Sequence, residues 1–237
     1  MRPALGFDFD HTLGLDNKLE LTIALETVER LCSLRNVRFE RAVATPVIEG
    51  AIASFRNGAV PLETALEGVY LRLAGAGPEN ADEAMRFREV AVNRAAEFVR
   101  PLPGLKGMLA ALSTLGIRYA MLTNGWSPLQ ETKARLVGFD APVLVSERIT
   151  LRKPQPEAFD MLAAHLGVPT SDLWYVGDDP LVDCGGALGA GASAVWFDWE
   201  GRRYPADLAR PTYVIHSLDE LTGLLQGHLS EAAKGGA

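Results

Sequence analysis

The apolar residues of this chain change period along its length, and the pattern in the second half is the strongest constraint on the fold. After residue 104, segments with apolar residues at helical spacing alternate with short segments that are apolar throughout. Strands that alternate with helices form a parallel sheet covered by helices on both faces. We therefore predict an α/β core for this part of the chain.

The individual elements of this core follow from the same change of period. The sequence predicts strands at residues 4–9, 117–123, 142–146, 173–177, 192–197 and 212–216. It predicts helices at 105–115, 127–137, 156–166, 181–190 and 217–228, followed by a frayed tail at 231–237.

Residues 15–100 interrupt this alternation after its first strand. Their apolar residues recur at helical spacing and are separated by glycine and proline breaks. We predict an all-helical inserted domain here, with Pro46 ending or kinking one helix. Residues 1–14 and 101–237 would then form the α/β core. The helices are expected at 19–34, 38–55, 61–74 and 79–99.

Charge and cysteine content narrow the class of protein. The formal net charge of −7 argues against a general binder of nucleic acid or membrane surfaces, because both need basic patches. The two cysteines, Cys32 and Cys184, are too few for a disulfide framework and suggest reduced thiols in a cytosol. No apolar run reaches the length of a membrane helix. We expect a cytoplasmic monomer or homodimer with no nucleic-acid or membrane partner.

Polar side chains follow four of the predicted strands. Ligands of open parallel sheets bind beyond the carboxyl ends of the strands. Each residue alone has a structural explanation as a helix cap or a turn residue, but four such strand ends favour one functional site. The residues are Asp8, Asp10 and Thr12; Thr123, Asn124 and Gly125; Ser146 and Lys153; and Asp178, Asp179 and Asp183.

A crevice that contains Asp8, Asp10 and Asp178 is electrostatically unfavourable unless positive charge compensates it. Mg²⁺ prefers oxygen ligands and is commonly held by one or two carboxylates together with water and phosphate. Lys153 adds a second positive charge. Mg²⁺ and Lys153 together predict a phosphate site in an otherwise acidic protein.

Four segments resemble, in order, the motifs of the haloacid dehalogenase-like (HAD) hydrolase superfamily. They are DFDHTL, LTNG, the lysine of RKPQPEAF, and GDDPLVD. The inserted helices resemble the helical cap that this superfamily carries between its first and second motifs. The resemblance covers the α/β core from residue 5 to about 200. It implies a Rossmann-like core, Mg²⁺ as cofactor and hydrolase activity.

The resemblance also implies a role for each catalytic position. Asp8 would be the nucleophile that forms an aspartyl-phosphate. Asp10 would protonate the leaving oxygen and then activate water, while its backbone carbonyl ligates Mg²⁺. Lys153 would offset the charge on Asp8 and on the phosphoryl group.

The remaining positions would bind substrate and metal. Thr123 and the backbone amide of Asn124 would hold phosphate oxygens, and Thr12 and Gly125 complete the expected substrate-binding set. Asp178 would ligate the metal. Asp183, with Asp179 as an alternative, would hold a metal-bound water or orient Lys153. His11 stands where the family often has glycine, and we expect this to be a tolerated variant.

These roles predict a Mg²⁺-dependent phosphatase that acts on a small phosphorylated metabolite. Asp10 favours phosphoryl transfer, because the dehalogenase branch does not keep an acid/base aspartate at this position. A phosphomutase, dehalogenase or phosphonatase is the alternative within the superfamily, and a non-catalytic phospho-ligand-binding protein is the alternative outside enzymes. The substrate and the role of inserted-domain residues such as Arg56 stay open. Cys32 and Arg38 match C-x5-R, but the segment lacks the glycine-rich loop of cysteine phosphatases.

Overall fold

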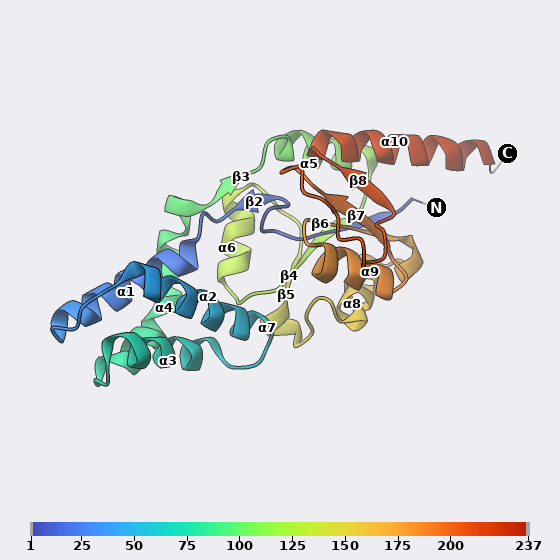
Figure 1. The fold of residues 1–237 in the computed structure, drawn as a ribbon. Coiled ribbons are helices and arrows are strands. Elements are labelled where there is room, and N and C mark those ends of the chain that lie inside the picture. The colour runs from blue at the N-terminus through green and yellow to red at the C-terminus, as the bar shows by residue number, and fades with distance from the viewer. Residues whose placement is uncertain (1, 236–237) are drawn as a thin grey trace. The chain divides into compact units, whose positions relative to one another are not determined.

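A computed structural model of the chain describes residues 2–235. The chain divides into two compact units, whose elements are labelled in Figure 1. One unit contains the residues up to Leu15 and those from Arg100 onward, and the other is Asp16–Val99. The boundaries expected from the sequence, 14/15 and 100/101, lie within one residue of these.

The first unit contains a six-stranded sheet with the order β5-β4-β1-β6-β7-β8. All neighbouring strands are parallel, so the α/β fold class predicted from the sequence is confirmed. The strands are β1 (Ala4–Phe7), β4 (Tyr119–Thr123), β5 (Val143–Val145), β6 (Leu173–Gly177), β7 (Ser193–Phe197) and β8 (Tyr213–Ile215). A short antiparallel pair, β2 (Gly14–Leu15) and β3 (Arg100–Pro101), lies where the chain leaves and re-enters this unit.

The central strand β1 is buried on both faces, as its apolar sequence ALGF predicts for a parallel strand. On one face, a Cβ at Gly6 would lie 2.4 Å from Leu162, so the absence of a side chain lets helix α8 (Pro156–Leu166) approach the strand closely. On the other face, the ring of Phe7 makes edge-to-face contacts with Tyr119 and Phe139. Both faces of β1 are therefore covered by closely packed side chains.

The other helices of this unit follow the predicted order, with a short helix at Ser146–Ile149 that the sequence did not predict and with differences at two of the predicted segments. They are α5 (Leu105–Leu115), α6 (Leu129–Leu136), α7 (Ser146–Ile149), α9 (Gly186–Gly189) and α10 (Leu218–Gly235), with the 3₁₀ turn η1 (Thr170–Asp172) and the π-helical turn η2 (Pro180–Gly185). The helix expected at 181–190 is divided between η2 and α9. The frayed tail is wrong for residues 231–235, which continue α10, because Glu, Ala and Lys are strong helix formers. Residues 236–237 of that tail lie outside the described part of the chain.

The second unit is helical, as predicted. Its helices are α1 (Leu19–Leu34), α2 (Arg41–Arg56), α3 (Leu62–Ala74) and α4 (Glu79–Phe98), and α1 packs against the other three. Pro46 does not end α2, which continues to Arg56. A proline removes a single backbone donor, and the packing of the buried side chains Ala44, Ile48 and Ile52 holds the helix together on both sides of it.

Arg56 and the C-x5-R segment from Cys32 to Arg38 both belong to this unit. Arg56 is the last residue of α2, and its guanidinium lies 2.5 Å from the buried carboxylate of Glu20. Cys32 is buried in α1 and burial raises the pKa of its thiol, whereas the Arg38 side chain is exposed and pairs with Glu40. The C-x5-R segment therefore does not form an anion-binding loop. Within residues 2–235, no helix has the length and hydropathy required to cross a bilayer.

Candidate active site

Asp8 follows β1 at the point where the order of the sheet reverses. The neighbours of β1 are β4 on one side and β6 on the other, and further strands are added outward on each side. Such a switch point leaves a crevice beyond the carboxyl ends of the strands. The backbone N–H of Asp8 donates to the carbonyl of Val176 (3.0 Å), so this residue is still anchored to the neighbouring strand β6.

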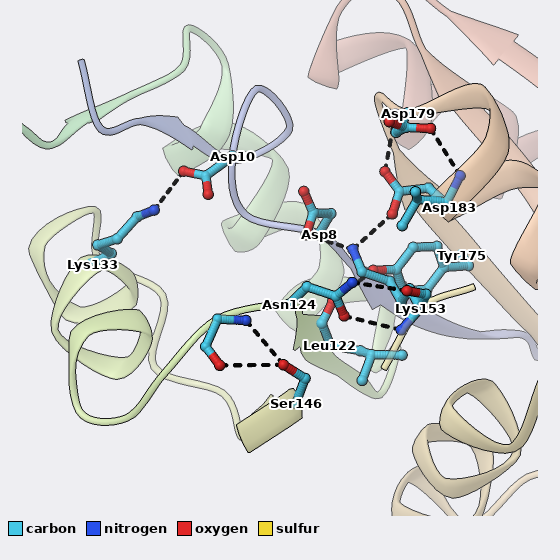
Figure 2. Close-up of polar contacts among 12 residues, drawn as sticks. Asp8, Asp10, Leu122, Asn124, Lys133, Ser146, Lys153, Tyr175, Asp179 and Asp183 are labelled. Atoms are coloured by element: carbon cyan, nitrogen blue, oxygen red, sulfur yellow. Dashed lines mark hydrogen bonds and ion pairs between the residues drawn. The ribbon is translucent and has the colours of Figure 1, made fainter. Parts of the chain in front are cut away.

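A buried lysine joins two of the predicted site residues. Lys153 Nζ donates to Asp8 Oδ1 at 2.6 Å and to Asp183 Oδ1 at 2.7 Å (Figure 2). The same ammonium lies 5.3 Å from the ring centroid of Tyr175, whose hydroxyl donates to the carbonyl of Leu122 (2.6 Å). All three charged side chains are buried. Burial alone would lower the pKa of Lys153, but the carboxylates of Asp183 and Asp8 hold this pKa well above its ordinary value.

The Asn124 side chain holds the backbone of Lys153. Its Nδ2 donates to the Lys153 carbonyl (2.8 Å), and its Oδ1 accepts from the Lys153 N–H (3.0 Å). The next residue, Gly125, donates its N–H to Ser146 Oγ and accepts from the same hydroxyl. The loop after β4 is therefore fastened to the segment that begins with α7 and carries Lys153.

The two threonines of the expected substrate-binding set are both buried. Thr123 is the last residue of β4 and is 1% exposed. Thr12 is fully buried, and its hydroxyl has no hydrogen-bond partner within the described residues. Thr12 lies in a tight turn in which the N–H groups of Thr12, Leu13 and Gly14 all point to the Phe9 carbonyl. Thr12 thus forms part of this turn through its backbone, and its expected role in substrate binding is still a prediction.

Three carboxylates form a cluster with the geometry of a cation site. Asp8, Asp178 and Asp183 each offer one oxygen, and these three oxygens lie within 4.8 Å of one another. Burial, followed by the charge of Asp8, raises the pKa of Asp178 to about 7, although Arg202 donates to the Asp178 carboxylate at 3.2 Å and opposes that shift. Hard oxygen donors at this spacing fit a divalent cation such as Mg²⁺, whose charge would stabilise the ionised cluster.

Asp179 and Asp183 have different surroundings, which bears on their expected roles. Asp183 Oδ1 accepts from Lys153, and its Oδ2 accepts from the Asp179 N–H (3.0 Å). The Asp179 carboxylate instead caps η2 by accepting from the N–H groups of Leu181 and Val182, each at 2.8 Å. A Cβ at Gly177 would lie 2.4 Å from Asp183, so the glycine makes room for this buried carboxylate.

Asp10 has a partner that the sequence analysis did not predict. The Asp10 carboxylate accepts from Lys133 Nζ at 2.5 Å, and Figure 2 shows the two side chains pointing toward one another. Lys133 belongs to α6, is fully buried, and lies 4.6 Å from the ring centroid of Phe9. Asp8 and Asp10, two residues apart, therefore each contact a buried lysine.

The backbone of His11 explains why glycine is common at this position in the family that the motifs resemble. Its φ is +58°, a left-handed conformation that favours glycine. The His11 side chain is exposed and stacks toward Trp199, with ring centroids 6.5 Å apart. The residue is thus accommodated by an outward-facing side chain.

The motifs, the fold and the acidic crevice agree with a comparison of whole sequences. The model of a family described as haloacid dehalogenase-like hydrolase matches residues 3–191. The chain belongs to this family and is a hydrolase.

Two curated relatives from Escherichia coli (strain K12) cover most of the chain. Pyrimidine 5'-nucleotidase YjjG is 31% identical over 179 residues, which is 73% of this chain and 77% of the relative. Hexitol phosphatase A is 30% identical over 193 residues, which is 75% of this chain and 86% of the relative. The names of both relatives describe enzymes that act on phosphate compounds.

Solved structures with different activities share this fold. A 2-haloacid dehalogenase from Pseudomonas syringae pv. Tomato DC3000 superposes with a TM-score of 0.73 at 22% identity, covering 95% of this chain and 99% of that one. A HAD phosphatase from Thermococcus onnurineus gives a TM-score of 0.68 at 22% identity, covering 94% and 97%. A dehalogenase and a phosphatase match about equally well, so the reaction has to be inferred from the residues of the site.

Proposed function

We propose that this hydrolase is a Mg²⁺-dependent phosphatase that acts on a small phosphorylated metabolite through an aspartyl-phosphate on Asp8. The observation that carries the proposal is the pair of aspartates after β1. Asp8 contacts Lys153, whereas Asp10 contacts Lys133, so each carboxylate has its own cation. Phosphoryl transfer through a covalent intermediate needs two such groups, one as nucleophile and one as acid and base.

In the first step, a carboxylate oxygen of Asp8 attacks phosphorus. The bond between phosphorus and the leaving oxygen breaks, and Asp10 gives its proton to that oxygen. Lys153 donates a hydrogen bond to Asp8 Oδ1 and thereby fixes the direction in which the other oxygen points. Fixed donors of this kind stabilise charge as it develops in the transition state.

In the second step, water attacks the phosphorus of the aspartyl-phosphate. Asp10 takes the proton from that water, the bond between phosphorus and Asp8 breaks, and inorganic phosphate leaves. The hydroxyl of Thr123 and the N–H of Asn124 are our candidates for holding the phosphate oxygens. Thr123 ends β4 and Asn124 follows it, and β4 is the neighbour of β1, the strand that Asp8 follows. A cation held by Asp8, Asp178 and Asp183, and by the Asp10 carbonyl, would neutralise charge on the phosphoryl group.

Two further parts of the proposal concern substrate choice. Residues 16–99 form a separate helical unit inserted between Asp10 and Thr123, and we assign it the role of a cap domain that selects the substrate. The names of the relatives suggest nucleoside monophosphates, sugar-alcohol phosphates, phosphoserine and phosphoglycolate as the compounds to test.

The experiment measures phosphate release from these compounds with added Mg²⁺, for the wild type and for Asp8→Asn. We expect release by the wild type, its loss in EDTA and its recovery with Mg²⁺. In Asp8→Asn, turnover should fall by about 10⁴-fold or more, because the nucleophile is gone.

Halide release from 2-haloacids, measured in parallel, tests the dehalogenase alternative. If the wild type releases halide and no phosphate, the phosphatase proposal is wrong. If Asp8→Asn keeps its turnover, the nucleophile is another residue.

A further inference from the structure

We propose that Lys133 is a positioning residue that holds the Asp10 carboxylate in place for proton transfer. The inference rests on the proposed function, because it takes Asp10 as the acid and base of phosphoryl transfer. The motifs that identify the site do not include Lys133, which lies inside helix α6.

The contact joins two segments that are far apart in the sequence. Asp10 is in the turn that follows β1, and Lys133 is 123 residues later. The Lys133 ammonium lies 2.5 Å from the Asp10 carboxylate, and the whole Lys133 side chain is buried. The ring of Phe9, the residue before Asp10, packs below the same ammonium. Burial of the side chain and the ring of Phe9 thus restrict where the Lys133 ammonium can lie while it contacts Asp10.

Asp10 needs such a constraint more than Asp8 does. The Asp8 side chain is 12% exposed and lies in the cluster of Lys153 and Asp183, whereas the Asp10 side chain is 22% exposed. A partly exposed carboxylate in a tight turn can rotate toward water. A misplaced proton donor slows the reaction even when its chemistry is intact, because catalysis depends on the distance and direction of transfer.

Structural stability alone is a poor explanation for a lysine at this position. Taking an ammonium out of water is costly, and apolar residues of similar volume often replace buried ion pairs without loss. Methionine has a similar length and would fill the same space beside Phe9. The contact with the carboxylate of Asp10 gives the charge at position 133 a role that an apolar side chain cannot fill.

The test compares leaving groups in Lys133→Met. Alkyl phosphates need a proton on the leaving oxygen, whereas p-nitrophenyl phosphate releases a stable anion and needs none. We expect kcat for the best alkyl phosphate to fall by about 100-fold, because a positioned general acid contributes at least that factor. For p-nitrophenyl phosphate, the rate constant of the first step, followed as nitrophenolate release in a single turnover, should change by less than about 3-fold. KM should be nearly unchanged for both compounds.

Gln130→Met is the matched control. Gln130 is on the same helix, one turn before Lys133, and is equally buried. A general disturbance of α6 would affect both compounds alike, so we expect the ratio of the two rates in Gln130→Met to equal that of the wild type. In an Asp10→Asn background, Lys133→Met should cause no further loss, because the group that it positions is gone.

Each outcome has a defined meaning. If Lys133→Met slows both compounds equally, or slows neither, the positioning role is wrong and the phosphatase proposal stands. If the losses of Lys133→Met and Asp10→Asn multiply in the double variant, Lys133 acts independently of Asp10 and the inference is wrong. If the wild type releases no phosphate from any compound, the proposed function fails first and the inference with it. Lys133→Gln, with the same expected split, replaces Lys133→Met if the methionine variant does not fold.

Discussion

The buried lysines that contact Asp8 and Asp10 show how one residue type can meet two different requirements. Lys153 lies between the carboxylates of Asp8 and Asp183, both of which are buried. Lys133 is at least as buried, yet the carboxylate that it contacts belongs to Asp10, which is partly exposed to water. The first ammonium therefore belongs to a fixed charge cluster, and the second restrains a group that solvent can reach.

This difference predicts different consequences when each charge is removed. Without Lys153, two buried carboxylates lose their common counter-charge, and uncompensated buried charge is strongly destabilising. Without Lys133, the Asp10 carboxylate can still be hydrated, and the desolvation cost of a buried ammonium disappears. Removal of the Lys153 charge should therefore lower both the stability and the turnover, whereas removal of the Lys133 charge should lower the turnover with little change in stability.

Lys153→Met should have a larger effect than any of the substitutions that follow. We expect kcat to fall by about 10³-fold, because a fixed donor to the nucleophile and to the phosphoryl group is lost. The free energy of unfolding should fall by about 3 kcal/mol in metal-free buffer, because Asp8 and Asp183 remain buried. Steady-state kinetics and urea unfolding measure the two quantities.

Added Mg²⁺ provides the control for this first prediction. A cation bound to the native carboxylate cluster stabilises the folded state by mass action, so Mg²⁺ should recover part of the lost stability. An unfolding midpoint that equals that of the wild type in metal-free buffer would contradict the view of Lys153 as the counter-charge of the cluster.

Asp178→Asn, compared with Asp179→Asn, should have the next largest effect. Asp178 lies in the three-carboxylate cluster, whereas Asp179 caps η2. We expect Asp178→Asn to raise the Mg²⁺ concentration for half-maximal activity by about 10-fold to 100-fold, as the loss of a group that supports a metal typically does. Asp179→Asn should leave this concentration unchanged, because asparagine is an equally good cap. The reverse result would assign the metal to Asp179.

Tyr175→Phe tests the support beneath Lys153 on a smaller scale. The substitution keeps the ring under the ammonium but removes the hydroxyl that donates to the Leu122 carbonyl. We expect the free energy of unfolding to fall by about 1 kcal/mol, which is typical of one buried hydrogen bond. Tyr213→Phe, in the edge strand β8, is the control and should change it by less than about 0.5 kcal/mol. Equal losses in both variants would mean that the Tyr175 hydroxyl has no special role.

Lys133→Met should have the smallest effect on stability. We expect the free energy of unfolding to change by less than about 1 kcal/mol, because the loss of the contact and the relief of lysine desolvation oppose each other. Urea unfolding of this variant beside Lys153→Met measures the contrast between the two lysines. A loss as large as that of Lys153→Met would remove the contrast and would make Lys133 a structural counter-charge.

Much of the crevice was predictable because strand ends are marked in the sequence and parallel strands end at one edge of a sheet. The structure brings Asp8, Lys153, Asp178 and Asp183 together there, as expected. Their catalytic and metal-binding roles are still predictions. The helical unit was equally predictable, because its apolar residues repeat at helical spacing over four segments.

Lys133 was missed because it is polar in a place where periodicity predicts solvent. The helix LQETKARL buries Gln130 and Lys133 beside Leu129 and Ala134, so half of its buried residues are polar. Which polar residue of a short helix turns inward depends on tertiary contacts that one sequence does not reveal. Arg202 was missed for a related reason, since it reaches Asp178 from the loop after β7, to which no motif pointed.

The paired hydrogen bonds between Asn124 and Lys153 have a consequence for local opening of the protein. Strand β4 ends at Thr123, yet the next side chain offers one donor and one acceptor to the backbone of Lys153, as an adjoining strand would do. Segments joined in this way open and close as one cooperative unit. Although Lys153 belongs to a loop, its amide hydrogen should exchange with solvent as slowly as those of the sheet. The side chain of Asn124 thus ties the backbone of Lys153 to the end of the β-sheet.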